Sequence, residues 1–280
     1  MKYKMSKSKD IVVIGGGSWG GALADQLLKA NNNVTVLTRR RETADALNQG
    51  SLIALPQVQL ERPIPSTTNP DCLSLAGLIV IAVPLSETVQ VVELITNYAS
   101  LDSVILFSGK GLFSHSEKGG IFLPEWINSN FDNFYSYGLI SGPSFADEVI
   151  SNKPTAVMIA SQSITLSTKI ADYFEESYLR CYIGDDITGV AVGGAVKNII
   201  AIAAGIATGL ELGNNARAAL VSRGLAEITR LAVKIGGRPQ TLNGLAGMGD
   251  LVLSCSSPHS RNMAFGMACL LYTSPSPRDA

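Results

Sequence analysis

Residues 10–20 read DIVVIGGGSWG, and this stretch predicts the fold of the first half of the chain. The apolar run Ile11–Ile14 has the length and the β-branched composition of a buried strand. Three glycines follow it directly, and Ser18–Ala30 then has apolar residues at helical spacing. A GxGxxG turn between a strand and a helix is typical of dinucleotide binding, because the turn and the helix amino terminus present amides to a pyrophosphate. The alternative is a glycine-rich turn that holds no ligand.

The glycines of this turn have separate tasks in such an arrangement. Gly15 allows the tight turn, Gly17 lets the backbone approach the pyrophosphate, and Gly20 permits the helix to pack closely on the strand. We therefore expect all three to belong to a cofactor site.

Strands and helices continue to alternate up to about Asp185. This order indicates βαβ units around a doubly wound parallel sheet of the Rossmann type. The further strands expected are 34–37, 76–83, 103–107, 137–140, 156–160 and 179–183. After Asp185 the strands stop, and two long helices are expected at Val190–Gly209 and Ala216–Ile235. We place the domain boundary at this change, with a sheet domain at residues 1–185 and a helical domain at residues 186–269.

The composition of the 280 residues fits a soluble protein with a small-molecule substrate. Hydrophobic residues make up 46% of the chain, and the formal net charge of -1 predicts no nucleic-acid partner. Two histidines and four widely spaced cysteines predict no metal site and favour reduced thiols in a cytoplasmic protein. The apolar stretch 190–210 has Lys197 and Asn198 near its middle, so we expect a buried helix there and no membrane span.

A basic segment after the second strand predicts which dinucleotide is bound. In the NAD version of this fold, an acidic residue at that position holds the ribose 2′-hydroxyl. Here Val34–Leu37 is followed by Thr38, Arg39, Arg40 and Arg41, so this segment offers no carboxylate. Arginine forks suit a 2′-phosphate, which favours NADPH, with NADH as the second choice. The alternative is a solvated basic loop.

Two further loops follow expected strands, at the edge where doubly wound sheets bind ligands. Lys110 lies in the loop 108–111 and is expected to face the crevice. The stretch SGPSFA at residues 141–146 opens a helix, with Pro143 suited to its first turn. Its amides could hold a phosphate or the nicotinamide end of a cofactor, or Ser141 could be a helix cap. The sequence leaves both interpretations open.

Lys197 is the residue that the sequence marks most clearly for chemistry. It lies on a helix made mainly of glycine, alanine, isoleucine and valine, so it must reach a polar pocket or lose its charge. A lysine in such a place suits proton exchange with a hydroxyl or a carbonyl group. The alternative is a lysine at the helix edge whose head reaches water. Gly193 and Gly194 weigh against it, because they let another segment approach closely.

A series of motifs, taken in order, resembles the bacterial NAD(P)-dependent glycerol-3-phosphate dehydrogenase family. The motifs are GGGSWG, FSGKG, SGPSFA, GGAVKNIIAIAAG, NNARAALVSRGLAE, GLAGMGDLVLSC and SRN, within residues 11–267. The resemblance implies a Rossmann-type domain joined to an all-α, 6-phosphogluconate-dehydrogenase-like domain, with the active site between them. It also implies an oxidoreductase that passes a hydride between NAD(P)H and dihydroxyacetone phosphate. The product would be sn-glycerol 3-phosphate for glycerophospholipid synthesis.

The resemblance also implies roles for single residues. Lys197 would exchange the proton at the substrate C2 oxygen, with Lys110 at the same oxygen and near the cofactor. The residues implied to line the substrate are Lys110, Gly142, Ser144, Lys197, Asp250, Ser260, Arg261 and Asn262. The residues implied to contact the cofactor are Ser18, Trp19, Arg39, Arg40, Lys110, Ala146 and Arg261. Taken alone, the segments around Asp250 and Arg261 would be only a turn and a cap.

The last residues leave the family pattern. Residues 270–280 contain two prolines in three positions and little to bury, so we expect a disordered tail and a truncated, incomplete helical domain. A homodimer is compatible with the sequence. Two rival functions remain open. One is a ketopantoate-type or other 2-ketoacid reductase, which needs no phosphate ligands; the other is a non-catalytic NADPH-binding protein, which needs no proton carrier such as Lys197.

Overall fold

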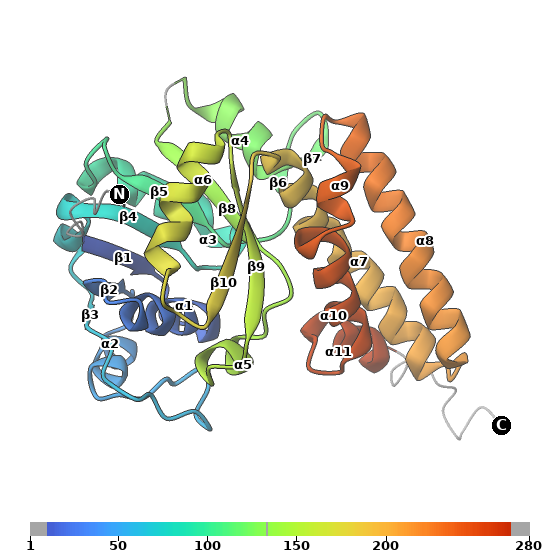
Figure 1. Cartoon of the computed structure of the whole chain (residues 1–280), viewed down its shortest axis with the longest axis horizontal. Helices are drawn as coiled ribbons and strands as arrows, with labels where there is room; N and C mark the ends of the chain where they lie inside the picture. Colours follow the sequence, from blue (N-terminus) through green and yellow to red (C-terminus); the bar gives the residue numbers. More distant parts are fainter. Residues whose placement is uncertain (1–9, 133, 270–280) are drawn as a thin grey trace, which may run out of the picture. The chain divides into compact units, whose positions relative to one another are not determined.

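The computed structural model of the chain describes residues 10–132 and 134–269, and these divide into two compact units (Figure 1). The first unit takes residues 10–140 and 144–187, and the second takes residues 141–143 and 188–269. The tail expected at residues 270–280 lies outside the described residues.

The first unit is built on an eight-stranded sheet with the order β10-β9-β8-β5-β4-β1-β2-β3. Its strands are β1 (Asp10–Ile14), β2 (Val34–Leu37), β3 (Ser66–Thr67), β4 (Ala76–Ile81), β5 (Val104–Phe107), β8 (Ser136–Ser141), β9 (Thr155–Ser161) and β10 (Leu179–Gly184). The doubly wound sheet expected from the sequence is thereby confirmed. β4 ends at Ile81, two residues earlier than expected, so Ala82 and Val83 belong to the following loop.

β1 marks the point where the order of the strands reverses. It pairs in parallel with β2 on one side and with β4 on the other, and Val12 lies opposite both Thr35 and Ile79. The chain therefore adds β2 and β3 in one direction and β4 and β5 in the other. In open α/β sheets a crevice for ligands forms at such a switch point, outside the carboxyl ends of the strands. The glycine turn after Ile14 lies at this place.

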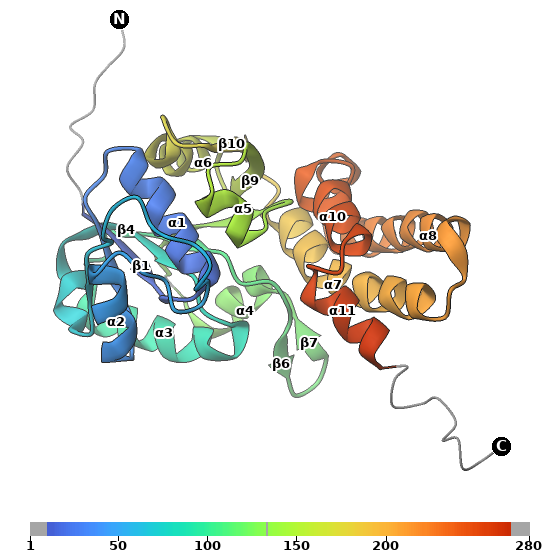
Figure 2. The same cartoon turned by 90° about the horizontal axis from the view of Figure 1, so that it is seen from below.

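Helices cover both faces of the sheet. They are α1 (Ser18–Lys29), α2 (Arg41–Asn48), α3 (Leu85–Tyr98), α4 (Leu123–Asn130), α5 (Ala146–Ile150) and α6 (Ile164–Ala171), with 3-10 turns at Pro70–Leu75 and Asp172–Phe174. α1 and α3 lie on opposite faces (Figure 2). Because both faces are covered, β4 is buried along its whole length. A hairpin of β6 (Phe113–His115) and β7 (Gly119–Ile121) forms a separate two-stranded sheet.

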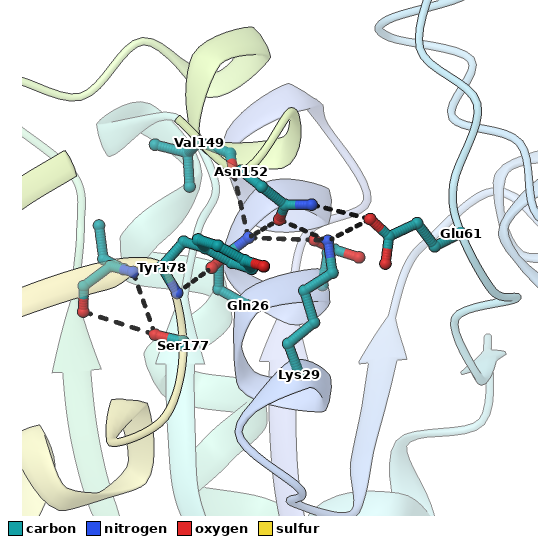
Figure 3. A network of polar contacts seen from close by, with 9 residues as sticks. Gln26, Lys29, Glu61, Val149, Asn152, Ser177 and Tyr178 are labelled. Atoms are coloured by element: carbon teal, nitrogen blue, oxygen red, sulfur yellow. Dashed lines mark hydrogen bonds and ion pairs between the residues drawn. The ribbon is translucent and has the colours of Figure 1, made fainter. Parts of the chain in front are cut away.

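A buried polar network holds the carboxyl half of α1 (Figure 3). Gln26 is fully buried at its centre. Its Nε2 donates to the Val149 carbonyl at 3.0 Å and to Asn152 Oδ1 at 3.2 Å, and its Oε1 accepts from the Tyr178 amide at 3.0 Å. One side chain thereby joins α1 to the end of α5 and to the residue before β10.

Lys29 extends the same network (Figure 3). Its Nζ lies 2.9 Å from Asp25 Oδ2, 2.6 Å from Asn152 Oδ1 and 3.5 Å from Glu61 Oε1. Burial raises the pKa of the Asp25 carboxyl, and Lys29 opposes this effect. The network thus connects α1, which follows the glycine turn, to the segments that contain Glu61, Asn152 and Tyr178.

Gln26→Leu is expected to lower the free energy of unfolding by about 1–3 kcal/mol. The reason is that the substitution leaves the buried Val149 carbonyl and Tyr178 amide without their partner. Urea denaturation of the whole chain measures the change. Gln90→Leu, on the exposed side of α3, is the matched control. Equal stability of the two variants would show that the network contributes nothing.

The second unit is helical. Its helices are α7 (Ile187–Gly209), α8 (Gly213–Lys234), α9 (Pro239–Leu242), a π-helical turn at Leu245–Gly249, α10 (Asp250–Ser256) and α11 (Arg261–Ala268). α7 and α8 lie side by side in Figures 1 and 2, and Gly224 of α8 faces the Ile200 side chain of α7. Both long helices begin three residues before their expected starts.

Glycines bring α7 close to its neighbours. A Cβ atom at Gly193 would lie 2.6 Å from the Ala246 carbonyl oxygen, and one at Gly205 would lie 2.1 Å from that of Met263. Only glycine permits these approaches, which explains the glycine-rich composition of the helix. α7 is long and apolar enough to cross a membrane, but half of its most apolar stretch is buried in the structure. The core helix of a soluble protein has the same length and composition.

Candidate active-site residues

The glycine turn has the geometry that dinucleotide binding requires. Gly15 has a φ of 115°, and a Cβ atom there would lie 2.6 Å from the Ala82 carbonyl oxygen. A Cβ atom at Gly20 would lie 1.9 Å from the Gly15 carbonyl oxygen, so this glycine permits the close packing of α1. At Gly17, which caps α1, no atom lies within 4 Å of the Cβ position. The turn therefore fits a pyrophosphate, which can approach the backbone at Gly17.

Two residues of the turn interact with other parts of the first unit. Ser18 Oγ donates to the Ala54 carbonyl at 3.2 Å, and Trp19 is partly buried against the core. Their expected contacts with a cofactor stay predictions.

The arginines after β2 lie at the carboxyl edge of the sheet and are exposed. Arg39 Nη1 lies 2.6 Å from Glu87 Oε2, in the first turn of α3. Arg40 Nε lies 4.0 Å from Glu42 Oε1. Residues 38–41 after β2 contain no carboxylate, and the structure brings the carboxylates of Glu42 and, from α3, of Glu87 to the arginines. Glu87 was missed because it is 48 residues away from Arg39 in the sequence.

Lys110 follows β5 at the same edge of the sheet. β5 pairs in parallel with β4, so its carboxyl end lies beside the end of β4. Ser108 Oγ donates to the Ile81 carbonyl at 2.8 Å and fixes the start of the loop. Gly111, with a φ of 152°, ends it. The loop thus places the half-buried Lys110 on the edge where the glycine turn also lies.

The SGPSFA segment differs from the sequence expectation. α5 begins at Ala146 with Phe145 as its cap, so Pro143 is not in the first turn and Ser141 is not the cap. The backbone at Phe145 is still extended, which is why the helix starts late. Among the described residues, the buried Ser141 Oγ has no hydrogen-bond partner. Gly142 has a φ of 149°, which lets the chain turn after β8.

The second unit places Lys197 in a buried polar cluster. Lys197 Nζ lies 2.5 Å from Asp250 Oδ1 and donates to Ser254 Oγ at 2.8 Å. The side chains of Lys197 and Asp250 are only 10% and 3% exposed. The alternative of a lysine whose head reaches water is therefore wrong. The carboxylate compensates the ammonium charge that burial would otherwise penalise.

α10 presents both partners of Lys197. Asp250 and Ser254 are four residues apart on this helix and therefore share one face. Ser254 was not singled out from the sequence, although its spacing from Asp250 could have indicated it. Next to it, burial raises the pKa of the Cys255 thiol to about 11, while Lys197 and Arg217 lower it. Cys255 is thus an unreactive neighbour of the cluster.

The SRN segment lies at the start of α11. Ser260 caps this helix, with its Oγ accepting from the Met263 amide at 3.4 Å, and Arg261 is exposed at the first helical position. Asn262 Nδ2 donates to Asn198 Oδ1 at 2.8 Å. Asn198 adjoins Lys197 on α7, so α11 is joined to the same part of the helix. Asn198 is a further residue to which the sequence alone assigned no role.

Known proteins match both units. The pattern of the NAD-dependent glycerol-3-phosphate dehydrogenase N-terminus matches residues 10–167, and that of the C-terminus matches residues 186–275. The chain belongs to the NAD-dependent glycerol-3-phosphate dehydrogenase family. It is thus an NAD(P)-dependent oxidoreductase of a small-molecule substrate. Among the described residues, no group of three or more histidine, cysteine, aspartate or glutamate side chains could hold a metal ion.

Individual relatives agree with this assignment. Glycerol-3-phosphate dehydrogenase [NAD(P)+] of Macrococcus caseolyticus is 41% identical over 261 residues, covering 91% of this chain and 78% of the relative. The crystal structure of glycerol-3-phosphate dehydrogenase from Coxiella burnetii has a TM-score of 0.82 at 36% identity and covers 94% of this chain and 81% of its own. A probable 2-dehydropantoate 2-reductase from Bacillus subtilis, at 16% identity and a TM-score of 0.56, covers 97% of this chain and 89% of its own. That likeness shows a shared fold and nothing more.

Proposed function

We propose that this chain reduces dihydroxyacetone phosphate to sn-glycerol 3-phosphate with NAD(P)H, and that Lys197 donates the proton. The observation that carries the proposal is the buried ammonium of Lys197 on the mainly apolar helix α7, which lies 2.5 Å from Asp250 Oδ1 of α10. A buried charge is costly, and a purely structural role could be filled by apolar residues of similar volume. A binding protein without catalysis would not need it.

The chemistry of the reaction suits such a lysine. Bound NAD(P)H supplies a hydride to the ketone carbon. Negative charge then grows on the C2 oxygen of the substrate, where an ammonium group stabilises it and delivers a proton. Asp250 and Ser254 fix the position of Nζ for this transfer. We assign Lys110 to the same oxygen as a second cation.

The substrate phosphate requires donors of its own. We assign it to Arg261, whose exposed guanidinium can form paired hydrogen bonds, and to Asn262. Gly142, Ser144 and Ser260 complete the proposed substrate contacts. Binding energy from the phosphate, which does not react, orients the ketone for hydride transfer.

We assign the 2′-phosphate of NADPH to Arg39 and Arg40. Replacing both with serine is expected to weaken NADPH binding by about 1–3 kcal/mol and NADH binding much less. Fluorescence titration of each cofactor measures the two losses. The variant Arg223→Ser with Arg230→Ser, which removes two charges from exposed positions on α8, is the matched control. Equal losses for both cofactors would exclude a role at the 2′-phosphate.

Location and assembly complete the proposal. We place the enzyme in the cytoplasm, as a homodimer that supplies glycerol 3-phosphate to glycerophospholipid synthesis. Support for the cytoplasm comes from the family assignment and from Cys72, Cys181 and Cys255, which form no disulfide. Light scattering of the purified chain tests the homodimer.

The test of the proposed function is a comparison of ketone substrates. Oxidation of NADPH is followed by its absorbance with dihydroxyacetone phosphate, with dihydroxyacetone and with ketopantoate. The proposal expects dihydroxyacetone phosphate to be strongly preferred, because only it has the phosphate. Preference for ketopantoate would favour the rival reductase.

A further inference from the structure

The ion pair between Arg39 and Glu87 lies at the place where the cofactor is expected. Arg39 follows β2 and Glu87 lies in the first turn of α3, after β4. β2 and β4 are the two neighbours of β1 in the sheet. The pair therefore joins the segments on either side of the carboxyl end of β1, where the glycine turn begins.

The contact is short although both groups are accessible to solvent. Arg39 Nη1 and Glu87 Oε2 lie 2.6 Å apart, and the side chains are 79% and 31% exposed. An ion pair this exposed contributes little to the free energy of unfolding. A ligand can therefore separate the two side chains without destabilising the fold. A ligand phosphate that needs Arg39 must compete with the carboxylate that already holds it.

We propose that Glu87 tunes the cofactor preference of the enzyme by competing with the 2′-phosphate of NADPH for Arg39. This inference rests on the proposed function, because it concerns the same cofactor site. NADPH must displace the carboxylate from the guanidinium, and NADH, which has a neutral 2′-hydroxyl, need not. Glu87 thereby moves the enzyme toward using both cofactors, although the segment after β2 consists of arginines.

The experiment compares Glu87→Gln with the unaltered chain in fluorescence titrations with NADPH and NADH. We expect the Kd of NADPH to fall by about three- to fivefold and that of NADH to stay within about twofold, given the size of exposed charge interactions. Added salt should reduce the difference in the Kd of NADPH between Glu87→Gln and the unaltered chain, because salt screens exposed charges. Glu93→Gln, six residues further along α3, removes the same charge without an ion pair among the described residues and serves as the control.

A double-variant cycle tests the competition itself. In an Arg39→Ser background, Glu87→Gln should change the Kd of NADPH by less than about twofold, because the contested guanidinium is gone. An equal fall in the Kd of NADPH in the Arg39→Ser background would overturn the inference. So would equal falls in the Kd of NADPH and NADH on Glu87→Gln, or a fall in the Kd of NADPH on Glu93→Gln as large as that on Glu87→Gln. If the unaltered chain bound neither cofactor, the proposed function itself would be contradicted.

Discussion

Lys197→Ala is expected to lower the turnover of dihydroxyacetone phosphate by about a hundredfold or more, the usual scale for a general acid. NADPH binding should change little, because the glycine turn, Arg39 and Arg40 belong to the other unit. The loss should appear in kcat, since the lysine acts on charge that grows only in the transition state. Steady-state kinetics and fluorescence titration of NADPH measure the two quantities.

Lys234→Ala is the control for this prediction. It removes an exposed lysine from the last turn of α8 and should change neither the turnover of dihydroxyacetone phosphate nor the binding of NADPH. Turnover of Lys197→Ala within a few fold of the parent would show that Lys197 is only structural. The circular dichroism of the variant must match the parent, so that a lower rate is not confused with unfolding.

Asp250→Ala is expected to destabilise the helical unit by about 3–5 kcal/mol, because it leaves the buried ammonium of Lys197 without its carboxylate. Ser254 would remain as a partner, but a hydroxyl does not compensate the charge. Guanidinium denaturation of the whole chain, followed by circular dichroism, measures the loss.

Two further variants separate the charge effect from packing. Lys197→Met combined with Asp250→Leu removes both charges and should recover most of the lost stability, since apolar side chains of similar size can replace a buried ion pair. Glu211→Ala removes an exposed carboxylate beside α8 and should change stability little. If Asp250→Ala lowers the free energy of unfolding no more than Glu211→Ala does, the buried pair of Lys197 and Asp250 does not stabilise the helical unit.

The features predicted best from the sequence are those with a local signal. The strand, glycine turn and helix of residues 10–29 have apolar periodicity and a required glycine geometry, and all three features appear as expected. Lys197 was found because a charge on an apolar helix contradicts the pattern around it. The short helices α2, α4 and α6 were missed, because eight residues have too few turns to establish a period.

Side chains that meet only in the folded chain could not be predicted. Glu87 approaches Arg39 because β2 and β4 both flank β1, which a local pattern does not reveal. Ser254 belongs to the cluster because α10 begins at Asp250 and presents it to Lys197 one turn later. The expectation for Pro143 was wrong for a local reason. A proline suits a first helical turn, but here the chain stays extended through Phe145.

Hydride transfer can be followed directly with NADPH that carries two deuterium atoms at C4 of the nicotinamide, so that either face delivers the label. The purified chain is incubated with this cofactor and dihydroxyacetone phosphate, and the products are analysed by mass spectrometry. We expect glycerol 3-phosphate with one deuterium at C2, and far less of it from Lys197→Ala. Absence of labelled glycerol 3-phosphate while NADPH binds would contradict this mechanism.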